Sequence, residues 1–395
     1  MMKFGKYQEI LKIRGFRHLI LYGFIARIPH AAIGVVLTLH ITQTLGESFA
    51  SAGIAAMIFM IGGAISGPWR GRTLDKKGLR YTLIPSIIIE AIVWPTIAFV
   101  NYYWMLPLIF IAGLFILPIY TIVRKSASVL VPQAQRKAAF SFDSISVEFI
   151  FMIAPALGII LCTRVSTSFT LIAFGLSSSL AGLGLWILNP PTESFESSPV
   201  VKQKLPLRQR LSWISAPLWG VFLASFSAGF VLVGTDMSII AFLGQLGHVD
   251  EAWIVYLFWC SASVIGAIYY GVVKRDVSPI LLPLAMAALI PLCVLGRTPL
   301  VLALLTIPTG LLCAASITSA TEKTSELVEE DSRGEALGWQ GSAMTVGSSV
   351  ASPLIGLSID NFGAWTGFTS SALVGVIVCL VALGLYGGRT KKLAL

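Results

Sequence analysis

Long runs of apolar residues, separated by short polar or charged stretches, fill most of this 395-residue chain. A run of about 20 apolar residues is long enough to cross a bilayer as a helix. Backbone groups in hydrocarbon must form hydrogen bonds within their own segment, so we interpret every run as helical. The pattern predicts twelve helices, at 18–42, 49–69, 81–101, 104–124, 139–162, 167–188, 216–243, 252–272, 278–296, 299–321, 336–358 and 364–386.

The composition agrees with a chain that is solvated mainly by lipid. Hydrophobic residues make up 56% of it and charged residues 12%, whereas soluble domains carry about 25% charged residues. This excludes a soluble enzyme, a disordered chain and a disulfide scaffold. We therefore predict an all-α membrane protein with short loops and no large additional domain.

The distribution of positive charge predicts the orientation. If the N-terminus lies inside and the helices alternate, almost all of the 28 Lys and Arg residues fall on the inner side. The outer side keeps only Arg164 and Arg297, as expected from the excess of positive charge in cytoplasmic loops. The first apolar segment is of spanning length and lacks an Ala-x-Ala exit, so we interpret it as a retained helix and not as a cleaved signal. We predict a multi-pass inner-membrane protein with both termini in the cytoplasm.

The longest internal connection, 189–215, is rich in Pro, Lys and Arg and divides the chain into two sets of six helices. We predict an N-terminal bundle at 1–188, a cytoplasmic linker at 189–215 and a C-terminal bundle at 216–395. A short motif in the first half, Ala-Pro-Ala-Leu-Gly at 154–158, has a similar counterpart in the second half, Ser-Pro-Leu-Ile-Gly at 352–356. Such an echo indicates duplicated six-helix units with a site between them.

The loop between the second and third predicted helices carries a patterned motif. Its distinctive residues are Gly71, Asp75, Lys76, Gly78 and Arg80. Glycines at both ends permit a tight turn, and the carboxylate could accept hydrogen bonds from a helix N-terminus while the two cations supply countercharge. The motif is either a latch between helices or a basic turn that serves only topology.

This Gly-x-x-x-Asp-Lys-x-Gly-x-Arg pattern, together with the six-plus-six layout, resembles the major facilitator superfamily. The resemblance covers the whole chain. It implies two pseudo-symmetric bundles that rock about a central cavity, with Asp75 helping to hold the outward-facing state. The helix at 139–162 keeps Ala154, Pro155 and Gly158 but lacks the full glycine series of the family's antiporters, which counts against export.

Ionisable residues inside the predicted helices are the main candidates for function, because each costs about 2.5–3.5 kcal/mol at the bilayer centre. The candidates for proton coupling or substrate binding are Arg27, His30, Glu90, Asp143, Glu148 and Asp236. Counting along the helices places Arg27, Glu90 and Glu148 near mid-depth. Asp143 lies nearer the cytoplasm, and Asp236 lies towards the outside.

One Arg and two carboxylates at similar depth suggest an internal ion pair whose carboxyl exchanges its proton. We interpret Glu148 as the proton carrier and Arg27 as its partner, with Asp143 and Glu90 secondary. The alternative is a static pair within the bundle. His30, on about the same face as Arg27, lines a cavity or bonds within its own helix, and Asp236 is functional or merely interfacial.

The motifs that are missing narrow the function. The sequence has no phosphate-binding loop, no zinc-binding helix and no channel filter, so we expect an ion gradient as the energy source, no metal, no cofactor and no enzymatic activity. The leading prediction is a monomeric secondary transporter that exports small amphipathic organic compounds with protons, sodium being left open. Its partners are then the substrate, the coupling ion and lipid, without nucleic acid. The alternatives are uptake of a small nutrient and, from another class, a non-transporting sensor or membrane enzyme.

Overall fold

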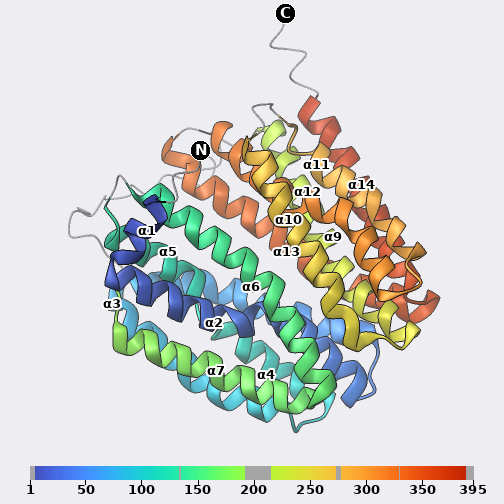
Figure 1. The fold of residues 1–395 in the computed structure, drawn as a ribbon, viewed down its shortest axis with the longest axis horizontal. Helices are drawn as coiled ribbons and strands as arrows, with labels where there is room; N and C mark the ends of the chain where they lie inside the picture. The colour runs from blue at the N-terminus through green and yellow to red at the C-terminus, as the bar shows by residue number, and fades with distance from the viewer. Residues whose placement is uncertain (1–4, 133–134, 192–214, 273–276, 329, 388–395) are drawn as a thin grey trace, which may run out of the picture. The chain divides into compact units, whose positions relative to one another are not determined.

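The computed structural model describes residues 5–132, 135–191, 215–272, 277–328 and 330–387. For some residues within helices, including Gly71, Asp75, Lys76 and Glu148, it describes the backbone alone. The described chain is helical and contains no strand (Figure 1). It divides into two compact units, Met1–Leu45 with Ile58–Val201 and Gly46–Met57 with Lys202–Leu395.

Helices α1 to α7 account for the first unit, apart from the start of α3. They are α1 (Gly5–Lys12), α2 (Arg14–Leu39), the π-helix η1 (His40–Thr44), α3 (Phe49–Ile97), α4 (Tyr102–Leu114), α5 (Ile119–Leu130), α6 (Arg136–Arg164) and α7 (Thr167–Leu188). Helix α2 packs against α5, α6 and α7. It therefore brings residues of α5, α6 and α7 close to its own side chains.

Helices α9 to α14 form the second unit together with the first residues of α3. They are α9 (Ala216–Leu246), η3 (Val249–Glu251), α10 (Ala252–Val272), α11 (Leu281–Leu289), η4 (Ile290–Leu295), α12 (Pro299–Glu326), α13 (Glu330–Phe362) and α14 (Trp365–Gly387). Helix α9 packs against α13 and α14, and α10 packs against α12.

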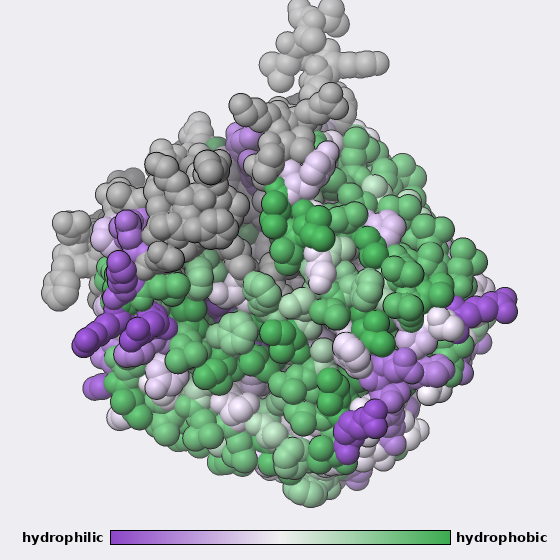
Figure 2. Space-filling view, viewed as in Figure 1, coloured by the Kyte–Doolittle hydropathy of each residue, from purple (hydrophilic) through white to green (hydrophobic). Residues whose placement is uncertain are grey.

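Among the described residues, eight helical segments are long and apolar enough to cross a membrane, and three shorter apolar helices accompany them. Large apolar side chains such as Phe99, Leu180 and Leu373 are exposed, and hydrophobic residues cover most of the face seen in Figure 2. Burial of apolar surface in lipid explains this exposure, because a soluble monomer rarely carries apolar patches of that extent. The all-α membrane fold is as predicted, while the count of twelve spans stays a prediction.

The connection between the second and third predicted helices is shorter than the sequence suggested. The segment α3 comprises two helices that meet at Gly78, which has a φ of 79° and a ψ of 175°. Glycine adopts this left-handed backbone without strain because it has no Cβ. The turn is thus a single-residue bend between two helical stretches.

The predicted helix at 104–124 is interrupted. Residues 115–118 separate α4 from α5. Pro118 has no N–H, and its ring disfavours helical backbone at the preceding residue, Leu117. The predicted helix at 278–296 likewise ends as a 3₁₀ segment, η4, with Pro291 in its first turn.

Two small residues bring α3 and α4 into backbone contact just before this interruption. A Cβ placed on Gly62 would lie 2.6 Å from the carbonyl oxygen of Phe110, and one on Gly113 would collide with the carbonyl of Phe59. Small residues at such crossings are typical of helix packing in membranes.

Candidate functional site

A buried ion pair joins α2 to α6. Nη1 of Arg27 donates a hydrogen bond of 2.7 Å to Oδ1 of Asp143, and each side chain is only 1% exposed. The two helices pack directly on one another, which brings residues that are 116 positions apart into contact. A buried charge without its partner costs several kcal/mol, so each group depends on the other.

The guanidinium of Arg27 is only partly satisfied. Its Nε and Nη2 atoms have no hydrogen-bond partner within the described chain. Its Cζ lies 4.8 Å from the ring centroid of Tyr120 in α5, a cation–π contact. Arg27 therefore retains N–H donors for an acceptor that the described residues do not supply.

The sequence paired Arg27 with Glu148, and the partner that the structure describes is Asp143. Glu148 belongs to the same helix, α6, but its side chain lies outside the described part of the chain. The role of Glu148 as proton carrier therefore stays a prediction.

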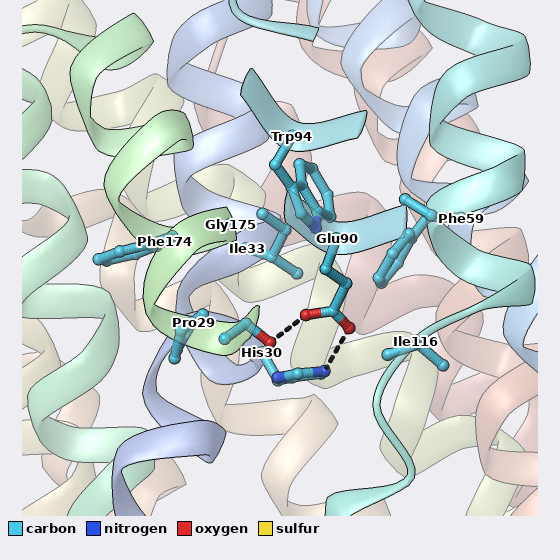
Figure 3. A pocket seen from close by; sticks show the side chains of 11 residues that line it. Pro29, His30, Ile33, Phe59, Glu90, Trp94, Ile116, Phe174 and Gly175 are labelled. Atoms are coloured by element: carbon cyan, nitrogen blue, oxygen red, sulfur yellow. Dashed lines mark hydrogen bonds and ion pairs between the residues drawn. The ribbon is translucent and has the colours of Figure 1, made fainter. Parts of the chain in front are cut away.

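A second pair, His30 and Glu90, lies in the same unit. Nε2 of His30 is 3.7 Å from Oε1 of Glu90, and both side chains are buried. Nδ1 of His30 is 2.8 Å from the carbonyl oxygen of Ala26, so the ring bonds within its own helix and faces a carboxylate as well. Figure 3 shows the Glu90 carboxylate directed at the His30 ring, with Phe59 to one side and Phe174 to the other.

Glu90 accepts two further hydrogen bonds. Its Oε1 accepts the backbone N–H of Leu117 at 2.8 Å, and its Oε2 accepts the hydroxyl of Ser178 in α7. The pocket around His30 and Glu90 is narrow and leaves space for about one water molecule. It suits a proton or a water molecule better than an organic substrate.

Asp236 lies on α9 in the second unit, and its side chain is exposed. The Arg27 and Glu90 pairs belong to the first unit and do not include it, and its function stays a prediction.

The bend motif is described in part. Nε of Arg80 donates to the carbonyl oxygen of Trp186 at 3.1 Å, and its guanidinium lies 5.0 Å from the Trp186 ring centroid. The side chains of Asp75 and Lys76, and the surroundings of Gly71, lie outside the described residues. The latch therefore stays a prediction, and the structure places the bend at Gly78.

Sequence reasoning missed Tyr120 and Ser178, which contact Arg27 and Glu90 respectively. It also missed Arg70, whose cation interacts electrostatically with Glu90. Arg70 was counted among the cytoplasmic loop charges, but it is buried and its guanidinium is bonded to Thr82 and Ser86. Tyr120 and Ser178 looked like ordinary residues of apolar helices. The available signal was Pro118, since a proline within an apolar run frees backbone groups that need polar partners.

No group of three or more potential metal ligands occurs within the described ranges. The polar groups that cluster there are arranged as pairs, each with one carboxylate and one basic side chain. Such pairs hold opposite charges together inside the bundle.

Comparisons with known proteins bear on this arrangement. The family model described as Major Facilitator Superfamily matches residues 19–295. A comparison with curated proteins finds no match.

Several solved structures share the fold. A bacterial homolog to the human lysosomal transporter Spinster, inward-facing and unoccupied, matches with a TM-score of 0.76 at 15% identity, over 94% of this chain and 95% of that one. A variant of the nucleoside transporter NupG matches with a TM-score of 0.79 at 15% identity, over 94% and 100%. A D-xylose-proton symporter matches with a TM-score of 0.69 at 15% identity, over 92% and 96%. At this identity the likeness shows the fold alone.

Proposed function

The chain belongs to the major facilitator superfamily, and on that premise we propose that it exports small amphipathic organic compounds in exchange for protons. The observation that carries the proposal is the buried pair of Arg27 and Asp143 in the first unit. An ionisable pair within membrane-spanning helices is costly, and in membrane proteins such pairs mark substrate paths and proton relays.

In this proposal Asp143 exchanges the proton. While ionised, its carboxylate accepts the hydrogen bond from Arg27. While the pair is intact it orients the remaining donors of Arg27, Nε and Nη2, towards an acceptor on the substrate. Adding a proton to Asp143 gives a neutral acid that holds the guanidinium less tightly, which favours release of the substrate. Loss of the proton restores the pair and the substrate site, so proton and substrate bind alternately. Glu148, on the same helix, is the second candidate for this role.

The substrate class follows from the donors that remain on Arg27. Nε and Nη2 suit an oxygen acceptor such as a carbonyl, hydroxyl or carboxylate. A single guanidinium with two remaining donors suits a molecule with one polar end better than a phosphate, which favours several cations.

The bend motif is assigned the gating role in the same proposal. Asp75 would help to hold one conformation, with Gly78 providing the bend and Arg80 anchored on Trp186. The membrane is the cytoplasmic membrane with both termini inside, as the positive charges favour.

Uptake of a small nutrient with protons is the second candidate. The helix α6 lacks the glycine series expected of antiporters, and one structural neighbour is a D-xylose-proton symporter. Uptake uses the same proton-binding pair but moves solute and protons in one direction.

A two-stage experiment tests the proposal. Purified protein is first screened by thermal shift against a broad panel of metabolites and drugs, with Arg27→Ala as the test variant and Arg297→Ala, at an exposed site, as the matched control. A hit is then supplied to proteoliposomes under an imposed pH gradient. Solute movement against the direction of the protons supports export, and movement with them supports uptake. Absence of any flux for every hit would overturn both.

A further inference from the structure

The interruption between α4 and α5 leaves backbone groups without helical partners, and two charged side chains form hydrogen bonds to them. Oε1 of Glu90 accepts the N–H of Leu117 at 2.8 Å, and Nη1 of Arg70 donates to the carbonyl oxygen of Ile116. Unbonded backbone groups within a membrane cost several kcal/mol each, so these contacts stabilise the interrupted geometry. We call residues 115–118 the break.

Arg70 also reaches across the bend in α3. Its Nη2 donates to the carbonyl oxygen of Thr82 at 3.1 Å and to the hydroxyl of Ser86. Arg70 and Glu90 lie on opposite sides of the bend at Gly78. Both side chains thus extend from α3, and their charged groups bond to the backbone of the break.

The pair of His30 and Glu90 needs a proton between them. Nδ1 of His30 lies at hydrogen-bond distance from the carbonyl of Ala26, so Nδ1 carries a proton and donates. In the neutral ring, Nε2 then presents a lone pair towards the Glu90 carboxylate 3.7 Å away. Two acceptors facing each other are unfavourable, and a single proton on either one makes the contact attractive.

We propose that Arg70 and Glu90 form a hinge clamp on the break, and that the protons held by His30 and Glu90 set its state. With one proton in the pair, Glu90 is ionised beside a cationic ring and is a strong acceptor for Leu117. A second proton neutralises Glu90, weakens its bond to the Leu117 N–H and loosens the break. The next helix then gains freedom to move relative to α4.

The groups that face Glu90 within the described chain come from four places. They are His30 on α2, Ser178 on α7, the N–H of Leu117 in the break and the cation of Arg70 on its own helix. The pocket seen in Figure 3 has space for about one water molecule, which can carry a proton to the pair.

The break also lies beside the Arg27 pair. Tyr120, in the first turn of α5, stacks on the guanidinium of Arg27. Movement of α5 would therefore change the surroundings of Arg27. The hinge goes beyond the proposed function, since it can be tested without a substrate and whatever the direction of transport.

The test is hydrogen–deuterium exchange at the amides of residues 115–117 in purified full-length protein, corrected for the intrinsic effect of pH. We expect the Leu117 amide to exchange about tenfold faster at acidic than at mildly alkaline pH, because a neutral carboxylic acid is a weaker acceptor than a carboxylate. Glu90→Gln is expected to exchange rapidly at both pH values. Ser177→Ala, which removes a neighbouring hydroxyl that donates to the carbonyl of Phe174 in its own helix, serves as the matched control and should keep the pH dependence.

The variant His30→Gln tests whether Glu90 responds to a proton or is only a structural hydrogen-bond acceptor. It leaves Glu90 in place and removes its proton partner, so the pH at which the break loosens should shift. Peptides from α10 in the second unit report global unfolding. Exchange at Leu117 that does not change with pH in the unaltered protein would overturn the proposal, as would an unshifted midpoint in His30→Gln. If Glu90→Gln fails to fold, the His30→Gln titration still decides.

Discussion

The guanidinium of Arg27 and the carboxylate of Asp143 form an ion pair at 2.7 Å in which each side chain is 1% exposed. The two ends of the pair come from α2 and α6, and the guanidinium also stacks on Tyr120. A pair so deeply buried contributes little net stability, yet breaking it leaves an uncompensated charge. Such a pair is suited to a conformational switch, and the cost of breaking it can be measured as a loss of stability.

Single substitutions in this pair should be more harmful than the double one. We expect Arg27→Met or Asp143→Leu alone to lower the free energy of unfolding by about 3–5 kcal/mol, because each leaves a buried charge. The double variant should recover most of that loss. Thermal unfolding of the purified variants measures this. Equal losses in the double and single variants would show that packing, and not charge, sets the cost.

The proton carrier is identified by comparing Asp143→Asn with Glu148→Gln in proteoliposomes. We expect Asp143→Asn to abolish solute movement driven by a pH gradient while exchange of labelled for unlabelled solute continues, because only the proton step is lost. Glu148→Gln should keep the pH-driven flux. The reverse pattern would assign the proton to Glu148, and two unaffected variants would exclude both residues.

Neighbouring glycines in α3 provide a matched pair for packing. Gly62→Ala would place a Cβ 2.6 Å from the carbonyl oxygen of Phe110, and backbone atoms of α4 cannot yield at low cost. We expect a loss of about 1–3 kcal/mol. In Gly63→Ala the new Cβ would lie 3.8 Å from its nearest neighbour, so stability should be unchanged or slightly higher. Thermal unfolding that is identical for both variants would contradict the close contact between α3 and α4.

The start of α3 depends on a carboxylate in α13. Oδ1 and Oδ2 of Asp360 accept the N–H groups of Phe49 and Ala50 at 2.9 and 2.7 Å, respectively, within the second unit. We expect Asp360→Ala to lower stability by about 0.5–2 kcal/mol, as loss of a helix cap does, and to speed amide exchange in the first turn of α3.

Asp360→Asn is the control for that change, because it keeps one acceptor oxygen and should be intermediate. Exchange at these first-turn amides that is as slow in Asp360→Ala as in the unaltered protein would show that the cap is not needed.

The fold class and family were predictable because they depend on features repeated along the chain. Apolar runs of spanning length and one-sided positive charge recur many times, so errors at single positions do not matter. The motif from Gly71 to Arg80 added a local pattern with few alternative explanations. The bend at Gly78 and the helices on both sides of it could be anticipated, although the shortness of the connection between them could not.

The candidate site was predictable only as a set of residues. Arg27, His30, Glu90 and Asp143 are recognisable because charges inside apolar helices are expensive. Which acid meets which base was not, since the rotation of α2 against α3 and α6 decides it. Arg70 was missed because its position next to other cations made it look like a loop residue.

Residue order alone thus determined that this chain is a helical membrane protein of a known transporter fold, since lipid imposes the same demand on every spanning segment. Tertiary packing decided that Arg27 meets Asp143, that His30 faces Glu90, and that Arg70 and Glu90 hold the break before Pro118. Those contacts join residues far apart along the chain, and their energies depend on distance and direction, which no local pattern encodes.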